Sequence, residues 1–295
     1  MSAPETQYCY RHPDRETGLS CSDCGRPICA DCATFAPVGI RCPDHAGARG
    51  AKKPLQIKPP KVPRARGVAL ATGSAPVTKL LIAANVAIYL LTVEQGGAGL
   101  NNPGGSLFIR WILWAPLVPH GGWYRLVTAM FLHGFLAHLI MNMIGLWLIG
   151  SQVEQYLGTV RYLALYFVSG LAGSAGALLL TPTQPVVGAS GAIFGVLGAM
   201  MILEWQVTGR LAGQAFTLIV INLLFNFAYN GLGGNISIGG HIGGTIGGIL
   251  ITLGYAHWRS GRAQYGQLGL GGILGLVAVA AASVVIAYVR VRGYA

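Results

Sequence analysis

Charged residues are scarce in this chain. Only 10% of its 295 residues are Asp, Glu, Lys or Arg, whereas a soluble globular protein carries about a quarter. Hydrophobic residues make up 53%, and the mean hydropathy is +0.55. This balance excludes an ordinary soluble protein for most of the chain and indicates a polytopic, all-α membrane protein.

Acidic residues are almost absent beyond the first 45 residues, which hold six of the nine. No aspartate follows Asp44, so a Ser-His-Asp triad within the apolar part is excluded. The three remaining carboxylates are Glu94, Glu154 and Glu204, near the ends of apolar segments. We expect Glu154 and Glu204 to be interfacial caps.

Cysteine is absent after Cys42, which excludes a disulfide scaffold shared along the chain. The six cysteines and two histidines form four pairs with spacing suited to tetrahedral zinc: Cys9-x2-His12, Cys21-x2-Cys24, Cys29-x2-Cys32 and Cys42-x2-His45. So short a segment has too few apolar residues to fold alone, so metal should supply the folding free energy. We predict that residues 1–46 form a module with two structural zinc ions and no open ligand position.

The spacing leaves the pairing of these ligands open. Sequential pairing would join neighbouring pairs. Cross-braced pairing, which resembles B-box-type zinc fingers, would use Cys9, His12, Cys29 and Cys32 for one ion and Cys21, Cys24, Cys42 and His45 for the other. Disulfides are the alternative, disfavoured by the paired histidines and by the cytoplasmic location inferred next.

No amino-terminal signal peptide is visible, because the first 45 residues are polar. Residues 46–79 then carry eight basic residues, no acid and five prolines. We predict a basic linker over 47–76 that is attracted to the lipid surface; nucleic-acid binding is disfavoured because the run lacks aromatic residues. By the positive-inside rule we expect the amino terminus to be cytoplasmic. The protein would then be a multi-pass protein of the cell membrane. Its zinc module could contact a cytoplasmic protein.

Seven apolar segments follow, each near the ~20 residues that span a bilayer. Their approximate limits are Val77 to Val93, Phe135 to Tyr156, Val160 to Leu180, Val187 to Gln206, Leu211 to Tyr229, Ile236 to Trp258 and Leu268 to Val289. Threaded from a cytoplasmic start, they place Arg290 and Arg292 outside, against the charge rule. The aromatic connection from Glu94 to Leu132 should lie partly in the headgroup zone.

Among the polar residues within these apolar segments are Ser190 in one and His241 in another. Polar groups at membrane depth are costly unless they serve a site, and serine with histidine is the minimum pair for acyl-transfer hydrolysis. Glycines recur at every fourth position around His241, as at Gly240 and Gly244, which allows close helix approach. We therefore predict that the two helices meet and form a serine protease site within the membrane.

A third element is His138-Leu139-Ile140-Met141-Asn142, whose spacing places His138 and Asn142 on one helix face. Two side-chain donors there could bind an oxyanion together with the backbone N–H of Ser190. The Gly-x-Ser-x-Gly elbow of soluble hydrolases does not fit, because Ala192 occupies the last glycine position.

Together these residues resemble the rhomboid intramembrane serine proteases. The resemblance covers about Val77 to Trp258 and rests on Trp123-Tyr124-Arg125, His133, His138-x-x-x-Asn142, Gly188-x-Ser190-Gly191 and Gly240-His241, in order. It implies that Ser190 is the nucleophile, His241 the general base, and His138 and Asn142 the oxyanion-binding side chains. It also implies that His133 braces the first loop and that Trp123 and Arg125 form its interfacial motif.

The resemblance further implies a six-helix core over 77–259 and an added carboxyl-terminal helix within 260–295. Some members carry a tyrosine four residues after the serine, stacked on the base; here Phe194 keeps the ring but lacks the hydroxyl. The implied substrates are transmembrane helices with helix-breaking or small residues, and catalysis needs no cofactor. Two rival functions are a catalytically inactive rhomboid-like binder of membrane helices and a membrane transporter, although a transporter should show internal repeats or more charge.

Overall fold

A computed structural model describes residues 7–36, 39–46, 74–97, 99–259, 262–264 and 268–294. The chain divides into two compact units, Met1–Gly67 and Val68–Ala295. The basic residues of the predicted linker lie outside the described residues, and Lys79, which follows the linker, lies in the first long helix. The linker and the predicted domain limits therefore stay predictions.

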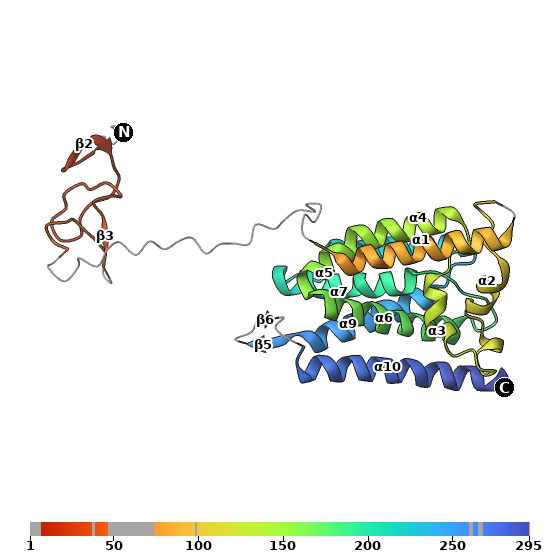
Figure 1. Ribbon diagram of the computed structural model, residues 1–295. Coiled ribbons are helices and arrows are strands. Elements are labelled where there is room, and N and C mark those ends of the chain that lie inside the picture. Colours follow the sequence, from red (N-terminus) through yellow and green to blue (C-terminus); the bar gives the residue numbers. More distant parts are fainter. Residues whose placement is uncertain are drawn as a thin grey trace. The chain divides into compact units, whose positions relative to one another are not determined.

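The amino-terminal unit contains two short antiparallel pairs of strands (Figure 1). β1 (Tyr8–Cys9) pairs with β2 (His12–Glu16), and β3 (Thr34–Phe35) pairs with β4 (Ile40–Arg41). Five of the cysteines are buried, and Ile28 is the other hydrophobic residue buried among the described ones of this unit. One aliphatic side chain is too small a core to stabilise a fold, so the thiols occupy the place of the core.

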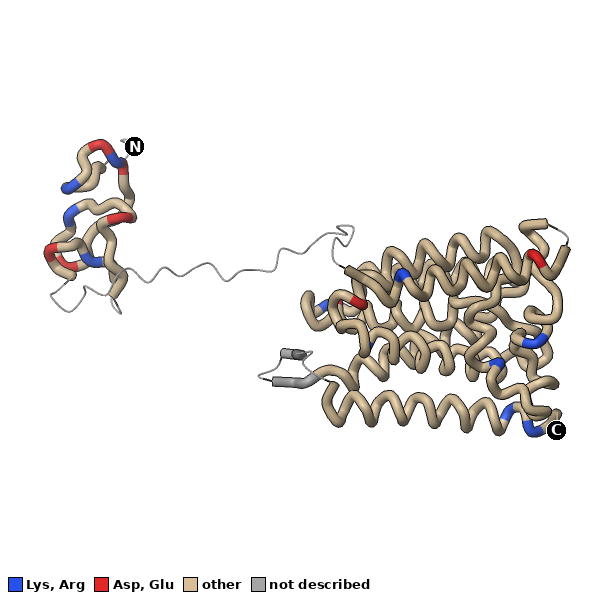
Figure 2. Tube along the Cα trace, viewed as in Figure 1, with Lys and Arg blue, Asp and Glu red and all other residues tan. Residues whose placement is uncertain are grey.

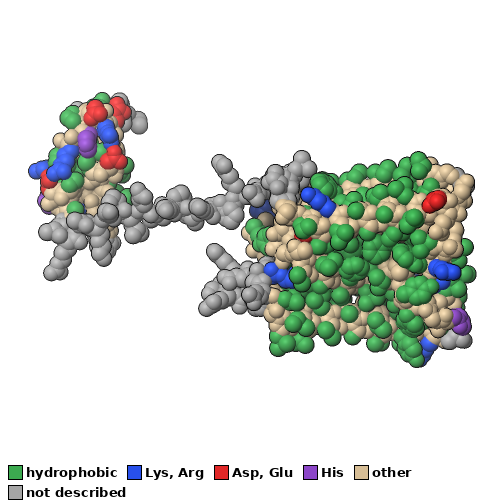
Figure 3. All heavy atoms as spheres, in the orientation of Figure 1, with side chains coloured by type: hydrophobic (Ala, Val, Ile, Leu, Met, Phe, Trp, Pro, Cys, Tyr) green, Lys and Arg blue, Asp and Glu red, His purple; other side chains and the backbone are tan. Residues whose placement is uncertain are grey.

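The second unit is a bundle of long helices (Figure 1). Its main elements are α1 (Pro76–Gly96), α4 (Leu136–Gly145) continued by the π-helical turn η3 (Leu146–Gly150) and α5 (Ser151–Leu157), α6 (Thr159–Leu180), α7 (Ser190–Thr208), α8 (Gln214–Gly231), α9 (Ile238–Tyr255) and α10 (Leu270–Val291). A helix lies within each of the seven predicted segments. Charged residues lie toward the two ends of the helices (Figure 2), and hydrophobic side chains cover the visible face between them (Figure 3).

Five of the described helices are long and apolar enough to cross a membrane: Pro76–Gly96, Leu136–Leu157, Thr159–Leu180, Ser190–Thr208 and Leu270–Tyr294. The two others, α8 and α9, have 18 residues each. α8 contains three asparagines, and α9 contains seven glycines and a histidine, which lower their hydropathy. His241 thus lies on a helix that hydropathy recognises less well than the helix of Ser190.

The observed helix ends differ from the approximate predicted limits by up to three residues, and two of these differences have a clear structural cause. α7 begins at Ser190 and not at Val187, because Gly188 has a φ of +126° that no helix contains. α9 ends at Tyr255 and not at Trp258, because β5 (His257–Arg259) pairs with β6 (Arg262–Gln264) in an antiparallel hairpin.

The first loop contains short helices: α2 (Gly105–Trp111), η1 (Ala115–Leu117), α3 (Arg125–Thr128) and η2 (Ala129–Phe131). Arg125 is 8% exposed, and its Nη1 atom donates hydrogen bonds to the carbonyls of Ile109 and Ile112, both at 2.8 Å. Trp123 stacks on Tyr288 of α10, with ring centroids 6.4 Å apart. The first loop is therefore stabilised by hydrogen bonds within itself and by contact with α10, the last helix.

Glycine lets α9 pack against two helices at once. A Cβ atom on Gly244 would overlap the Gly191 carbonyl of α7, and one on Gly248 would overlap the Gly195 carbonyl of the same helix. On the neighbouring face, a Cβ atom on Gly243 would overlap a carbonyl of α6. Without a hydrophobic drive between helices in lipid, such backbone contact supplies the packing energy. The predicted approach of the helices that carry Ser190 and His241 is confirmed.

Candidate active site and metal clusters

Ser190 is the first residue of α7, at the end of a constrained segment. The Gly188 N–H donates to the Ala129 carbonyl at 2.9 Å, and Leu113 and Val186 form an antiparallel bridge that ties this segment to the first loop. The positive φ of Gly188 suits glycine alone among common residues. Ser190 is thus held at the amino end of a helix, where backbone N–H groups lack intrahelical partners and favour an anion.

His241, the fourth residue of α9, faces Ser190. Its Nε2 atom lies 2.9 Å from the Ser190 Oγ, across 51 residues of sequence. The ring is 6% exposed and stacks on Phe194, with centroids 4.0 Å apart and an interplanar angle of 9°. The alcohol and the imidazole are therefore within hydrogen-bonding distance, and Phe194 limits rotation of the ring.

His138 and Asn142 both lie on α4. A Cβ atom on Gly188 would lie 2.8 Å from the His138 Nε2 and 3.7 Å from the Ser190 Oγ, so the His138 ring borders the serine loop. Asn142 is 7% exposed, and its Nδ2 donates to the His138 carbonyl at 2.9 Å. His138 is thus beside the serine, whereas the Asn142 donor is bonded within its own helix.

His133 is fully buried, and its ring meets that of His138 edge-on at 5.1 Å between centroids. It precedes α4 and follows the first loop. Its ring contact is with His138, and its predicted role in bracing the first loop stays a prediction.

Asn226 was not among the site residues predicted from the sequence. This α8 residue is 3% exposed, and its Nδ2 atom lies 2.5 Å from the His241 Nδ1. The signal was available, because Asn222, Asn226 and Asn230 recur at every fourth position of one apolar segment. Spacing alone could not show which of the three faces the histidine.

Comparison with known proteins shows the family of this chain. The Rhomboid domain family matches residues 120–258. A putative rhomboid protease YdcA of Bacillus subtilis is 35% identical over 138 residues, which are 46% of this chain and 69% of that protein. The chain belongs to the rhomboid family. The family and the apolar helices make it a multi-pass membrane protein.

Other rhomboid relatives match longer segments. Rhomboid protease GluP of Bacillus subtilis is 32% identical over 230 residues, 77% of this chain and 43% of that protein. RHOMBOID-like protein 5 of Arabidopsis thaliana is 39% identical over 166 residues, 52% of this chain and 49% of that protein. The chain thus spans less than half of these two relatives' length.

Glu154 and Glu204 cap helices in this rhomboid, as predicted, and their place at the membrane interface stays a prediction. The Glu154 carboxylate accepts hydrogen bonds from the backbone N–H groups of Val77 and Thr78, at 3.0 and 2.8 Å, and from the Thr78 hydroxyl. The Glu204 carboxylate accepts one from Ala215 N–H at 3.0 Å. Both carboxylates cap the first turn of another helix, where negative charge is stabilising. Glu154 is 2% exposed and hence buried within the protein.

The cysteine and histidine residues gather in two clusters: Cys9, His12, Cys29 and Cys32, and Cys21, Cys24, Cys42 and His45. The ligand atoms of each cluster lie within 4.8 Å of one another. The Cys24 and Cys42 sulfurs are 3.8 Å apart, and the Cys42 sulfur lies 3.1 Å from the His45 Nδ1. Sulfurs bound to one tetrahedral zinc ion are about 3.8 Å apart, so the clusters fit a metal ion. The grouping is the cross-braced one.

The thiols of the first cluster differ in acidity. Burial raises the pKa of the Cys32 thiol to about 11, assisted by its neighbours Cys29 and Cys9. For Cys9 burial acts in the same direction, but hydrogen bonds from the backbone of Cys29 and Arg11 outweigh it and lower the pKa to about 6. These hydrogen bonds therefore favour the thiolate form of Cys9, and a dication would stabilise the thiolates of the other cysteines.

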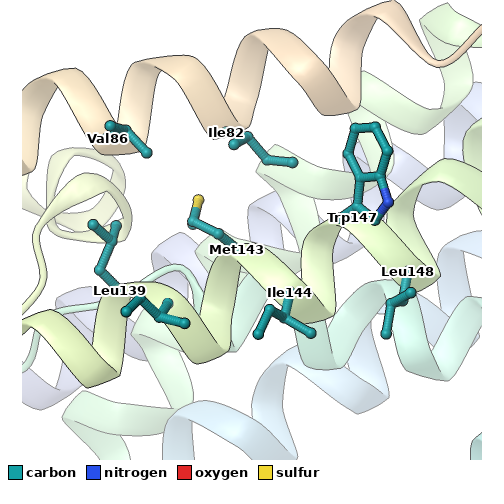
Figure 4. Close-up of a pocket in the computed structure, with 8 residues that line it drawn as sticks. Ile82, Val86, Leu139, Met143, Ile144, Trp147 and Leu148 are labelled. Carbon is teal, nitrogen blue, oxygen red and sulfur yellow. The ribbon is translucent and has the colours of Figure 1, made fainter.

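An apolar groove of 540 Å³ lies elsewhere, between α1 and α4 (Figure 4). Its lining residues are Ile82, Val86, Leu139, Ile140, Met143, Ile144, Trp147 and Leu148. None of them is a nucleophile or a titratable group, so the groove is not the candidate active site.

Proposed function

We propose that the protein is an intramembrane serine endopeptidase that cleaves transmembrane helices of membrane proteins. The observation that carries this proposal is the distance of 2.9 Å between the Ser190 Oγ and the His241 Nε2. Two rhomboid relatives of this chain are named as proteases, which supports the proposal. The chain's own residues supply the chemistry, and no cofactor is required.

In the proposed reaction, the Ser190 oxygen attacks the carbonyl carbon of the scissile bond while its proton passes to the His241 Nε2. The oxyanion that forms is stabilised by the Ser190 backbone N–H, with His138 and Asn142 as proposed side-chain donors. The proton on His241 then passes to the leaving amine, and the acyl-enzyme remains. Water, deprotonated by His241, hydrolyses the ester and restores Ser190.

The His138 ring position supports this oxyanion role directly. Asn142 fits it after its side chain turns from the carbonyl of its own helix toward the oxyanion, because the charge of the oxyanion makes it the stronger acceptor. A substrate helix must unwind locally before its peptide bond can reach Ser190, so helices with small or helix-breaking residues are the proposed substrates.

We also propose that each amino-terminal cluster holds one zinc ion. Two cysteine-rich, four-ligand sets suit zinc in its structural role, and with four protein ligands neither set leaves a position for substrate. Residues 1–46 would then form a cytoplasmic, protein-binding module, joined through a linker over 47–76 to a peptidase core over 77–259 and an added helix within 260–295.

A serine-directed fluorophosphonate probe tests the enzymatic proposal against the inactive-binder and transporter alternatives. The purified protein in detergent should be labelled on Ser190, and Ser174→Ala should label equally. Ser174 is a matched control, because its hydroxyl is buried but donates to the Leu126 carbonyl at 2.7 Å. Absence of labelling in the folded protein, or labelling that survives Ser190→Ala, would reject the proposal.

A further inference from the structure

Both ring nitrogens of His241, the candidate base, have a hydrogen-bond partner. The His241 Nε2 faces Ser190 at 2.9 Å, and its Nδ1 faces the Asn226 amide at 2.5 Å. Both His241 and Asn226 are buried, at 6% and 3% exposed. The ring is thus held by two hydrogen bonds and by the stacked ring of Phe194.

Asn226 reaches the ring because the turn between α8 and α9 is fixed. Asn230, one turn after Asn226, donates to the Ile236 carbonyl at 2.7 Å and accepts from the Ile236 N–H at 2.8 Å. Ser237 then caps α9 by accepting from the Gly240 N–H. These bonds set the register of the two helices, so Asn226 and His241 come to the same level.

Asn226 is also an unusual residue for its helix. The buried residues of α8 are Ala215, Ile219 and Asn226, so most of this helix is exposed, and its one buried polar side chain is the one that meets the histidine. A buried amide without a partner is costly. The third asparagine, Asn222, donates to the Leu218 carbonyl of its own turn and does not contact the histidine.

A neutral imidazole has one donor and one acceptor nitrogen, and the partner of one nitrogen selects the role of the other. A base toward Ser190 needs its lone pair on Nε2 and therefore its proton on Nδ1. An acceptor beside Nδ1 favours that tautomer, whereas a donor there favours the inactive one. The asparagine amide carries both an oxygen and an NH₂ group, which exchange places when the side chain rotates by half a turn.

We infer that Asn226 is a positioning residue for the catalytic base, and that in the reactive state its Oδ1 accepts the Nδ1–H of His241. The structure shows the amide with Nδ2 toward the ring, so the reactive state requires the half turn. The inference rests on the proposed peptidase function and turns the Ser-His pair into a Ser-His-Asn arrangement. Asparagine takes this third place in some other hydrolases.

The test compares three variants of the full-length protein in detergent, with a fluorogenic transmembrane peptide as substrate. Asn226→Leu keeps the volume but removes the hydrogen bond, and should lower kcat about 10- to 100-fold with KM within about twofold. Asn226→Asp restores an acceptor and should raise kcat at least about tenfold above Asn226→Leu. The control Asn222→Leu should stay within about twofold of the unaltered protein. These sizes follow from the loss of one orienting hydrogen bond to the base.

A spectroscopic measurement separates positioning from mere packing. In protein with ¹⁵N-labelled histidine, His241 should be an Nδ1–H tautomer, and Asn226→Leu should change it to a mixture of tautomers. Equal tautomer populations in the two proteins, or a kcat of Asn226→Leu within twofold of the unaltered value, would overturn the inference. If Asn226→Leu fails to fold, the comparison of Asn226→Asp with the unaltered protein decides it, because loss of the Nδ1–H signal in that variant would contradict the role.

A failure of the peptidase proposal would give a different result in these experiments. In that case the unaltered protein shows no Ser190-dependent cleavage, and all three variants are equally inactive. A protein that cleaves through Ser190 and His241 but ignores changes at Asn226 rejects only the positioning role.

Discussion

Gly244 of α9 and Gly191 of α7 touch backbone to backbone, with no room for a Cβ atom between them. The contact lies three residues from His241 along one helix and one residue from Ser190 along the other. The distance between the candidate base and the candidate nucleophile therefore depends on the absence of a side chain at Gly244.

Gly244→Ala should move α9 away from α7 and separate the base from the serine. We expect a loss of stability of about 1–3 kcal/mol from overpacking and a larger loss of peptidase activity. Gly231→Ala is the matched control, because its Cβ atom would meet nothing within 4 Å. Thermal unfolding and cleavage rates, measured together, check the prediction; an active Gly244→Ala would show that this contact does not position the site.

Removal of an oxyanion donor should leave binding intact and slow the chemistry. His138→Ala and Asn142→Ala should each lower kcat about 10²- to 10³-fold, the loss typical for one such donor, with little change in KM. Steady-state kinetics on a transmembrane peptide provide the measurement. A normal kcat for Asn142→Ala would mean that its amide stays bonded to the His138 carbonyl throughout the reaction.

Glu154 should contribute to stability and not to catalysis. Glu154→Ala leaves the backbone N–H groups of Val77 and Thr78 without their acceptor and should destabilise the bundle by about 1–3 kcal/mol. Glu94→Ala, at an exposed position near the end of α1, should change stability by less than about 0.5 kcal/mol. Equal unfolding midpoints for the two variants would contradict the capping role.

Metal removal should unfold the amino-terminal module alone. Mass spectrometry under native conditions should find two zinc ions per chain, and a strong chelator should abolish the dispersed amide signals of residues 7–46, because one buried aliphatic residue cannot hold the fold. The helical unit has its own core, so its signals should remain. A module that keeps its fold after both ions are removed would reject the proposed structural role.

Replacement of one ligand distinguishes the two clusters. Cys29→Ser should remove one ion, the one assigned to Cys9, His12 and Cys32, and leave the other cluster loaded. Ser22→Ala changes a residue of the module outside both clusters and should retain two ions. Loss of both ions from Cys29→Ser would mean that the clusters fold only together.

The candidate site residues could be predicted from the sequence where a general rule links residue type to environment. Ser190 and His241 were identified because polar groups are rare in apolar helices. The glycines around His241 indicated the close helix packing that brings these two residues together. The cysteine pairs indicated two metal clusters but not their pairing, because that depends on how the strands between the pairs turn back.

Other features could not be read in advance. Asn226 meets His241 only because Asn230 and Ile236 fix the turn between their helices, a long-range consequence that a spacing pattern does not encode. The start of α7 was misplaced, because the backbone of Gly188 is set by its contacts with the first loop and not by local helix propensity. The buried place of Glu154 likewise depends on where α1 begins in space.

The most direct test of the account is cleavage of a transmembrane substrate by the purified protein in liposomes, with Ser190→Ala and His241→Ala beside it. The unaltered protein should cut the substrate within its membrane segment, and each variant should fold normally but lower the rate to background. Undiminished cleavage by a folded Ser190→Ala protein would contradict the proposed role of Ser190.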